Sequence, residues 1–198
     1  MGLIDEDVRV RMFVAVVPPE GVLEDLEEFL APRREAAPWR WTLPEQWHVT
    51  LAFLEDVPDH ALDELVERLT ATAGKRDPMP AQVRGGGAFP HVGEAKVIWA
   101  GLETDQEELA RAAVGARSAA SGAGVEVDGQ RFRPHVTLAR LNRPVEATKW
   151  VRLLDGYVGP TWTVEDIALV ASYLGEGPRG RPRYEVVERF SLGRAGSG

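Results

Sequence analysis

The chain contains no cysteine, which excludes several kinds of site at once. Disulfide frameworks, zinc sites built from thiolates and cysteine nucleophiles are all ruled out. A glycine-rich phosphate loop is missing as well, because Gly85-Gly86-Gly87 lies inside a strand-like segment and opens no helix; such a run indicates a bend. Lysine is scarce, with three copies against 20 of arginine. Arginine suits phosphate recognition, since its planar guanidinium donates two parallel hydrogen bonds.

Long apolar runs are also missing, and none approaches the roughly 20 residues of a membrane helix. The segment Met1–Asp7 is acidic and lacks the basic-then-apolar pattern of a signal peptide. We therefore expect a cytoplasmic protein that does not contact membranes. The net charge of −8 argues against a polybasic nucleic-acid binder. A local basic groove is compatible with it, because binding follows the local field.

The spacing of apolar residues alternates between two and about 3.6, which predicts a mixture of strands and helices. Without a strict βαβ alternation, an α+β sandwich is favoured over a doubly wound parallel sheet. The length fits one domain or two small lobes. The expected strands cover residues 10–17, 48–54, 81–89, 96–101, 125–127, 134–139, 161–174 and 183–192. The expected helices cover residues 20–30 and 59–69, a segment capped by Thr104 or Asp105 and ending near 120, and 144–154.

A short internal repeat is the most informative feature. His48-Val49-Thr50-Leu51 recurs as His135-Val136-Thr137-Leu138, and alanine follows both copies. In a strand, residues i and i+2 share one face. Each copy therefore presents one imidazole and one hydroxyl on one face, while its two apolar residues anchor the strand in the core. The repeat predicts that two similar lobes each contribute one strand to a shared site.

Two imidazoles facing one cavity suit general acid–base catalysis, because one ring can be neutral while the other is protonated. The neighbouring hydroxyls can donate hydrogen bonds to non-bridging phosphate oxygens. The set predicts in-line displacement at phosphorus: one imidazole activates water and the other protonates the departing oxygen. This chemistry needs neither a metal nor a covalent intermediate, and we expect no cofactor.

These motifs and their surroundings resemble a known family. The repeat is similar to the two signature motifs of the 2H phosphoesterase superfamily. More narrowly, the chain resembles the RNA 2',3'-cyclic phosphodiesterase family, historically called 2'-5' RNA ligases. The similar parts are the segment 11–16 followed by Pro18, the motif strands 47–54 and 133–140, Trp99 and Tyr184. The resemblance spans about residues 10–192. It implies a single bilobal domain over residues 1–198, with pseudo-symmetric lobes, antiparallel sheets lining a central cleft, and helices outside.

The resemblance also implies an activity, the metal-independent hydrolysis of RNA 2',3'-cyclic phosphate ends, or of 2',3'-cyclic nucleotides, to 2'-phosphomonoesters. His48 would donate a proton to the leaving 3'-oxygen, and His135 would activate water. Thr50 and Thr137 would hold the phosphate. Glu55 stands where relatives often have glycine, and we expect no effect on the chemistry.

Other side chains near the motifs are candidates for binding. Four arginines lie between residues 130 and 144, and three between 177 and 184, without an acidic residue in either stretch. Arg140 is the best candidate for a phosphate contact, although strand alternation points it away from His135 unless the strand ends or bulges first. Phe13 could line the cleft. We expect Trp47 in the core and His60 and His91 at the surface. For Trp39-Arg40-Trp41, both packing in the core and stacking on a base stay open.

Three alternatives stay open at this point. The same acid and base serve the reverse reaction, which joins a 2',3'-cyclic phosphate to a 5'-hydroxyl in a 2'-5' link. The chain could also be a module that binds nucleotides or RNA ends without turnover. A zinc site is a poorer interpretation, because no third recurring ligand accompanies the two histidines. A monomer without a protein partner is the expectation.

Overall fold

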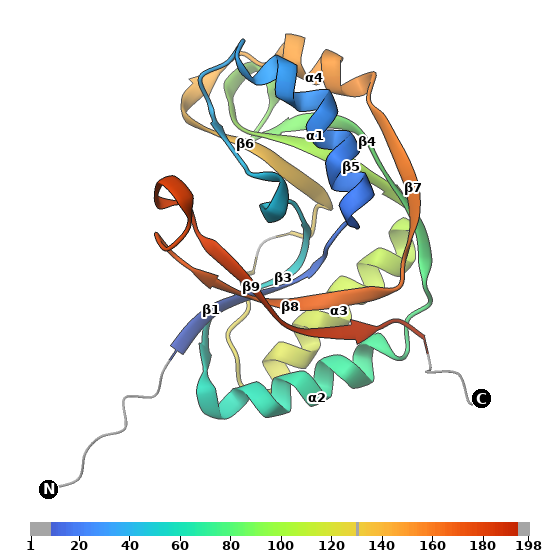
Figure 1. Cartoon of the computed structure of the whole chain (residues 1–198). Helices are drawn as coiled ribbons and strands as arrows, with labels where there is room; N and C mark the ends of the chain where they lie inside the picture. Colours follow the sequence, from blue (N-terminus) through green and yellow to red (C-terminus); the bar gives the residue numbers. More distant parts are fainter. Residues whose placement is uncertain (1–8, 130, 194–198) are drawn as a thin grey trace, which may run out of the picture.

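The computed structural model describes residues 9–129 and 131–193, which form a strongly curled antiparallel sheet with helices on its outside (Figure 1). The strands are β1 (Arg9–Val16), β2 (Arg40–Trp41), β3 (Val49–Pro58), β4 (Met79–Phe89), β5 (Ala95–Thr104), β6 (His135–Val145), β7 (Val158–Val164), β8 (Asp166–Tyr173) and β9 (Arg183–Ser191). The helices are α1 (Glu20–Arg34), α2 (Leu62–Ala73), α3 (Gln106–Gly122) and α4 (Thr148–Asp155). None of these described helices is long and apolar enough to cross a membrane.

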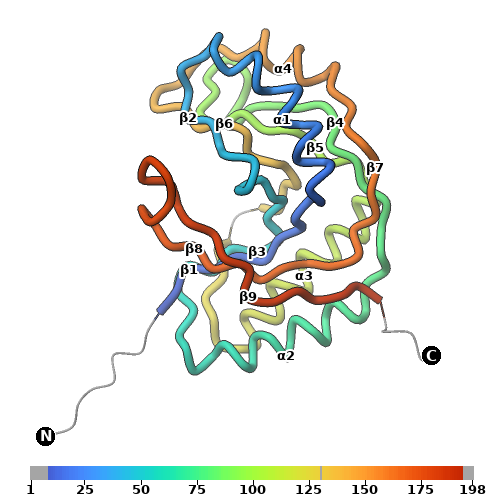
Figure 2. The backbone as a smooth tube through the Cα atoms, in the orientation of Figure 1, coloured from blue at the N-terminus to red at the C-terminus, as the bar shows by residue number. Residues whose placement is uncertain are grey.

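The sheet consists of two four-stranded halves that meet at one point. Its strand order is β7-β4-β5-β6-β3-β1-β8-β9, with the short β2 beside β6. Strands β3 and β6, which carry the two copies of the repeat, join the halves through the single register pair Val49↔Val136. The tube view shows β4, β5 and β6 in the upper part of the molecule and β1, β8 and β9 in the lower part (Figure 2). The repeated motifs therefore lie side by side at the centre of the molecule.

Helices from distant parts of the chain cover the outer faces of the two halves. Helix α3 packs on β3 and on α2, on the half that contains β1, β8 and β9, whereas α1 contacts β7 and α4 packs on β4 (Figure 1). Helix α1 buries Val22, Leu26 and Leu30, which share one face. Helix α3 begins where the Asp105 carboxylate accepts hydrogen bonds from two backbone N–H groups of the first turn. Of the two candidate caps, Thr104 and Asp105, the structure shows Asp105.

The predicted α+β class with antiparallel strands around a central cleft is confirmed, but several element boundaries are wrong. Residues 125–127 form no strand. The expected strand 161–174 is two strands, β7 at one edge of the sheet and β8 in the other half. Pro144 does not open a helix, because β6 runs to Val145 and α4 begins at Thr148. The two-residue strand β2 was not predicted.

Candidate active site

A β-bulge in each motif strand decides which side chains face the cleft. Along β3, Ala15 pairs with Thr50 while its neighbour Val14 pairs with Ala52, so Leu51 is an extra residue. Along β6, the bulge falls at the same place in the motif, and Leu138 is the extra residue. A bulge reverses the alternation of side chains beyond it.

The bulges therefore turn the residues that follow each motif into the cleft. Arg140 lines the cleft together with His135 and Thr137, and Phe53 does so together with His48. The condition attached to Arg140, that the strand bulge first, is met. The two halves differ at this matching position, since one presents an aromatic ring and the other a guanidinium.

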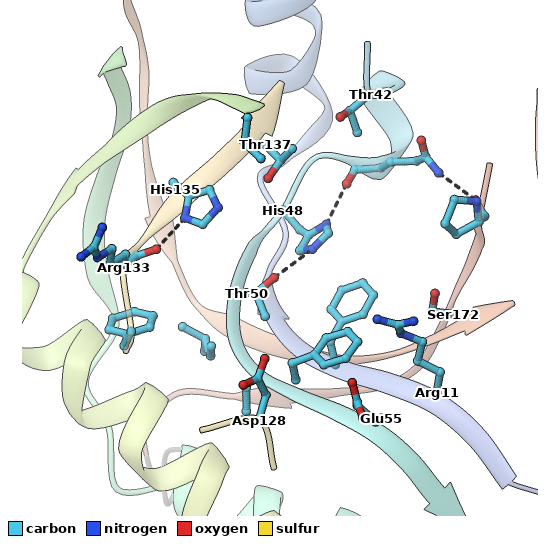
Figure 3. A pocket seen from close by; sticks show the side chains of 18 of the residues that line it. Arg11, Thr42, His48, Thr50, Glu55, Asp128, Arg133, His135, Thr137 and Ser172 are labelled. Atoms are coloured by element: carbon cyan, nitrogen blue, oxygen red, sulfur yellow. Dashed lines mark hydrogen bonds between the residues drawn. The ribbon is translucent and has the colours of Figure 1, made fainter. Parts of the chain in front are cut away.

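The cleft is a cavity of about 1110 Å³ between the halves. All six residues expected to act or bind line it, and Figure 3 shows four of them, His48, Thr50, His135 and Thr137, on the neighbouring motif strands. Extending the antiparallel register from Val49↔Val136 by one residue sets His48 beside Thr137 and Thr50 beside His135. The register therefore brings the two imidazole–hydroxyl pairs next to each other across the junction.

Backbone carbonyls fix the orientation of both imidazoles. His48 Nδ1 lies 2.7 Å from the Gln46 carbonyl oxygen, and His135 Nδ1 lies 2.6 Å from the Arg133 carbonyl oxygen. A carbonyl only accepts hydrogen bonds, so in each ring Nδ1 carries the proton and donates it. Each neutral ring therefore keeps its lone pair on Nε2. Thr50 Oγ1 lies 3.1 Å from Nε2 of His48.

Aromatic rings support the two imidazoles from behind. Phe13 stacks on His48 with ring centroids 4.4 Å apart, and Tyr184 meets His48 edge-on at 5.6 Å. Phe13 is 3% exposed, so it packs beneath the His48 ring. On the other side, Phe89 meets His135 edge-on at 4.9 Å. The rings hold both imidazoles rigidly and remove water from around them.

Burial and charge lower the pKa of both histidines. Desolvation is the largest cause for His48, whose pKa falls to about 4, and the positive charges of His135 and Arg140 lower it further. Desolvation followed by Arg140 also lowers the pKa of His135. Hydrogen bonds from Nδ1 to the two carbonyls oppose these effects. Both rings of the protein alone are therefore neutral near pH 7, and an anion bound between them would favour their protonation.

The loop between β8 and β9 is joined to the edge of the cleft by hydrogen bonds. Gln46 Nε2 donates to the Pro182 carbonyl at 2.7 Å, and the Arg181 guanidinium donates to the Trp41 carbonyl at 2.8 Å. Gln46 is 7% exposed and also supplies the carbonyl that orients His48. This residue was not predicted, although its position two residues before the first histidine matches that of Arg133 before the second.

The other expectations near the motifs have mixed outcomes. Trp47 is buried, as predicted, whereas Trp39 and Trp41 pack with Trp150. His60 and His91 are exposed, as predicted. Of the seven arginines that lie in residues 130–144 and 177–184, three line the cleft, namely Arg131, Arg133 and Arg140. In residues 9–129 and 131–193, no three His, Asp or Glu side chains gather where a metal ion could be held.

Comparisons with known proteins show the family to which the chain belongs. The family model described as the 2'-5' RNA ligase superfamily matches residues 17–176. An RNA 2',3'-cyclic phosphodiesterase of Thermus thermophilus is 35% identical over 189 residues, which are 92% of this chain and 90% of the relative. The Aquifex aeolicus protein of the same name is 29% identical over 188 residues, covering 93% of this chain and 98% of the relative.

Solved structures share the fold. The crystal structure of the Thermus thermophilus protein TT0787 has a TM-score of 0.73 and 33% identity, covering 92% of this chain and 97% of that one. The crystal structure of E. coli LigT in apo form has a TM-score of 0.74 at 24% identity, covering 93% and 98%. The family resemblance of the repeated motifs is thus confirmed, and the chain belongs to the 2'-5' RNA ligase superfamily.

Proposed function

We propose that the protein hydrolyses 2',3'-cyclic phosphate ends of RNA to 2'-phosphomonoesters, with His48 and His135 as the acid–base pair. The observation that carries this proposal is the arrangement of the imidazoles, each of which donates Nδ1–H to a backbone carbonyl and lines the same cleft. The names of the Thermus and Aquifex relatives support the substrate class.

The proposed reaction is an in-line displacement. Nε2 of His135 takes a proton from water, whose oxygen forms a bond to phosphorus. The bond between phosphorus and O3' breaks, and Nε2 of His48 gives its proton to O3', leaving the phosphate on O2'. Placing the reacting groups in line between two fixed rings lowers the entropic part of the barrier. Protons and electrons balance without a metal, a cofactor or a covalent intermediate.

Three further side chains are assigned to the phosphate. Thr50 and Thr137 border the two imidazoles, and their hydroxyls can donate to the non-bridging oxygens. The Arg140 guanidinium lies close enough to lower the pKa of both histidines. A pentacovalent transition state carries more charge on these oxygens than the substrate does, so donors fixed around them favour the transition state.

The charge of the substrate has a second role in this proposal. His48 is neutral in the empty cleft because its pKa is about 4, yet a general acid must carry a proton. The cyclic phosphate brings a negative charge and offsets the positive charge of Arg140, and both changes raise the pKa of the His48 ring. Substrate binding therefore charges the acid before the chemical step.

Single substitutions of the two histidines test the proposal. His48→Gln and His135→Gln each remove one proton-transfer group, which reduces kcat on a 2',3'-cyclic mononucleotide by about 100-fold or more. His91→Gln is the matched control, because His91 is exposed and pairs with Glu94 on the surface. Its turnover stays at the wild-type value. Near-normal turnover in both motif variants would falsify the proposal.

Two further measurements separate the proposal from its alternatives. Activity persists in EDTA, whereas loss that added zinc restores would support a metal site. With RNA fragments that end in a cyclic phosphate and a 5'-hydroxyl, hydrolysis yields 2'-phosphate ends, and ligation would yield a 2'-5' linked product. Tight binding without any product would indicate a binding module. We also propose that the protein is cytoplasmic and monomeric and consists of one bilobal domain.

A further inference from the structure

Most arginines that line the cleft form no ion pair, whereas many arginines outside it do. Among the residues that the structure describes, eight arginines outside the cleft form ion pairs with carboxylates, namely Arg9, Arg34, Arg68, Arg76, Arg84, Arg111, Arg183 and Arg189. Five arginines line the cleft. In the described residues 9–129 and 131–193, four of them form no ion pair with a carboxylate, namely Arg11, Arg131, Arg133 and Arg140, whereas Arg117 donates a hydrogen bond to the Asp128 carbonyl. The cleft of this acidic protein therefore has more positive charge than its own side chains neutralise.

Arg11 packs on an aromatic ring of the cleft. Its guanidinium lies over the Phe53 ring, 4.4 Å from the ring centroid, and both side chains line the cleft. Glu55 lines the same cavity without forming an ion pair with Arg11. The cation–π contact fixes the guanidinium plane and leaves N–H groups for an external acceptor. The bulge at Leu51 makes this possible, because it turns Phe53 toward the cleft.

Arg11 lies on the His48 side of the cleft. Figure 3 shows it with Ser172 beyond His48, while Arg133 lies at the opposite end beyond His135. The positive charges of Arg11 and Arg140 both act on Tyr184, whose ring meets His48 edge-on at 5.6 Å.

The direction of the proposed displacement places the rest of the substrate on this side. The leaving O3' faces His48 and belongs to the ribose of the terminal nucleotide, whereas the attacking water enters from the His135 side. The terminal nucleoside therefore extends from the phosphate toward His48, Tyr184 and Arg11. Its 5'-oxygen carries the phosphate that links it to the preceding nucleotide.

We propose that Arg11, oriented by Phe53, binds the phosphate on the 5' side of the terminal nucleotide. The cleft then binds two phosphates of its substrate, the cyclic phosphate and this one. A guanidinium donates two parallel hydrogen bonds to a phosphate. This inference rests on the proposed function and narrows its substrate class to nucleotides with a 5'-phosphate, either free or within an RNA chain. Phe53 is a positioning residue that acts through Arg11.

Three substrates test the subsite. The first is a 2',3'-cyclic mononucleotide with a 5'-hydroxyl, the second is the same nucleotide with a 5'-phosphate, and the third is a dinucleotide that ends in the cyclic phosphate. For the wild-type protein, kcat/KM for the second and third exceeds that for the first about tenfold or more, because a hydrogen bond between charged groups is added. A preference shown by the third substrate alone would mean that the preceding nucleoside is bound rather than its phosphate, and would overturn the proposal.

Variants on strand β1 assign the preference to a residue. In Arg11→Met, kcat/KM for the 5'-phosphorylated nucleotide and for the dinucleotide, each divided by kcat/KM for the nucleotide with a 5'-hydroxyl, both fall to about one. For the dinucleotide, the slope of log kcat/KM against log salt concentration also becomes shallower by about 0.7. Arg9→Met is the control, because Arg9 is two residues away on the same strand and pairs with Asp56; both ratios stay at their wild-type values. Phe53→Leu lowers the ratios in the wild-type background and has no further effect together with Arg11→Met.

The outcomes separate this inference from the proposed function. A preference that survives in Arg11→Met but disappears in Arg133→Met would place the nucleoside on the His135 side and overturn the subsite. Absence of turnover with all three substrates would contradict the proposed function instead. In that case, affinities for a nucleoside 2'-phosphate with and without a 5'-phosphate, compared between wild type and Arg11→Met, still decide the subsite.

Discussion

The burial of His48 makes the stability of the protein depend on pH in a way that one substitution isolates. The pKa of His48 is lowered from its ordinary value of 6.5 to about 4, chiefly by desolvation. The unfolded chain therefore binds the extra proton more readily than the folded one, and the stabilisation is present above pH 6.5 and lost as the pH falls toward 4. For one group with these two pKa values, the loss between pH 7 and pH 5 is about 2 kcal/mol.

Urea unfolding at pH 7 and pH 5, followed by tryptophan fluorescence, measures this loss. In His48→Gln the side chain no longer titrates, so the drop in the free energy of unfolding is smaller than in wild type by about 2 kcal/mol. All other titrating groups are shared, and His91→Gln controls for removal of an exposed histidine. Equal drops in wild type and His48→Gln would refute the reasoning that burial suppresses protonation of this ring.

The remaining predictions concern catalysis and packing. The profile of kcat/KM against pH reports the free protein, so the lowered pKa values of both motif histidines place its maximum below pH 6.5; a maximum above pH 7 would contradict them. Thr137→Val lowers kcat/KM about tenfold by removing a hydrogen bond to phosphate. Asp105→Ala reduces the free energy of unfolding in urea by about 1 kcal/mol, because the α3 cap is lost. Gly87→Ala reduces the melting temperature, since its Cβ would overlap the Trp99 ring.

The features best predicted from the sequence are those that depend on residues close together in the chain. The repeated tetrapeptide predicted the two strands, the shared face of each imidazole–hydroxyl pair and the common cleft, because strand alternation is a local rule. A cap at Thr104 or Asp105 was predicted in the same way, since a side-chain oxygen before a helix satisfies N–H groups close by in sequence, and the structure shows that Asp105 is the cap. Local rules of this kind need no knowledge of the tertiary structure.

The sequence was least informative where strands change partners. In segment 161–174 the charged pair Glu165-Asp166 is the only interruption, and an exposed pair within one long strand would give the same pattern, so the sequence does not mark Glu165 as the point at which the chain leaves one half of the sheet for the other. The strand β2 has only two residues and exists because β6 offers it an edge. The carbonyl that orients each imidazole depends on the backbone path before the motif, and the bulges depend on pairing with β1 and β5. Such features are set by partners distant in sequence.

The place where the two halves of the sheet join has a mechanical consequence. The register pair Val49↔Val136 immediately follows His48 on one strand and His135 on the other. Any opening or closing of the halves about this junction moves the outer walls, including the β8–β9 loop, through long arcs. Groups next to a pivot travel least, so such a motion would widen the entrance and leave the spacing of the two imidazoles nearly unchanged.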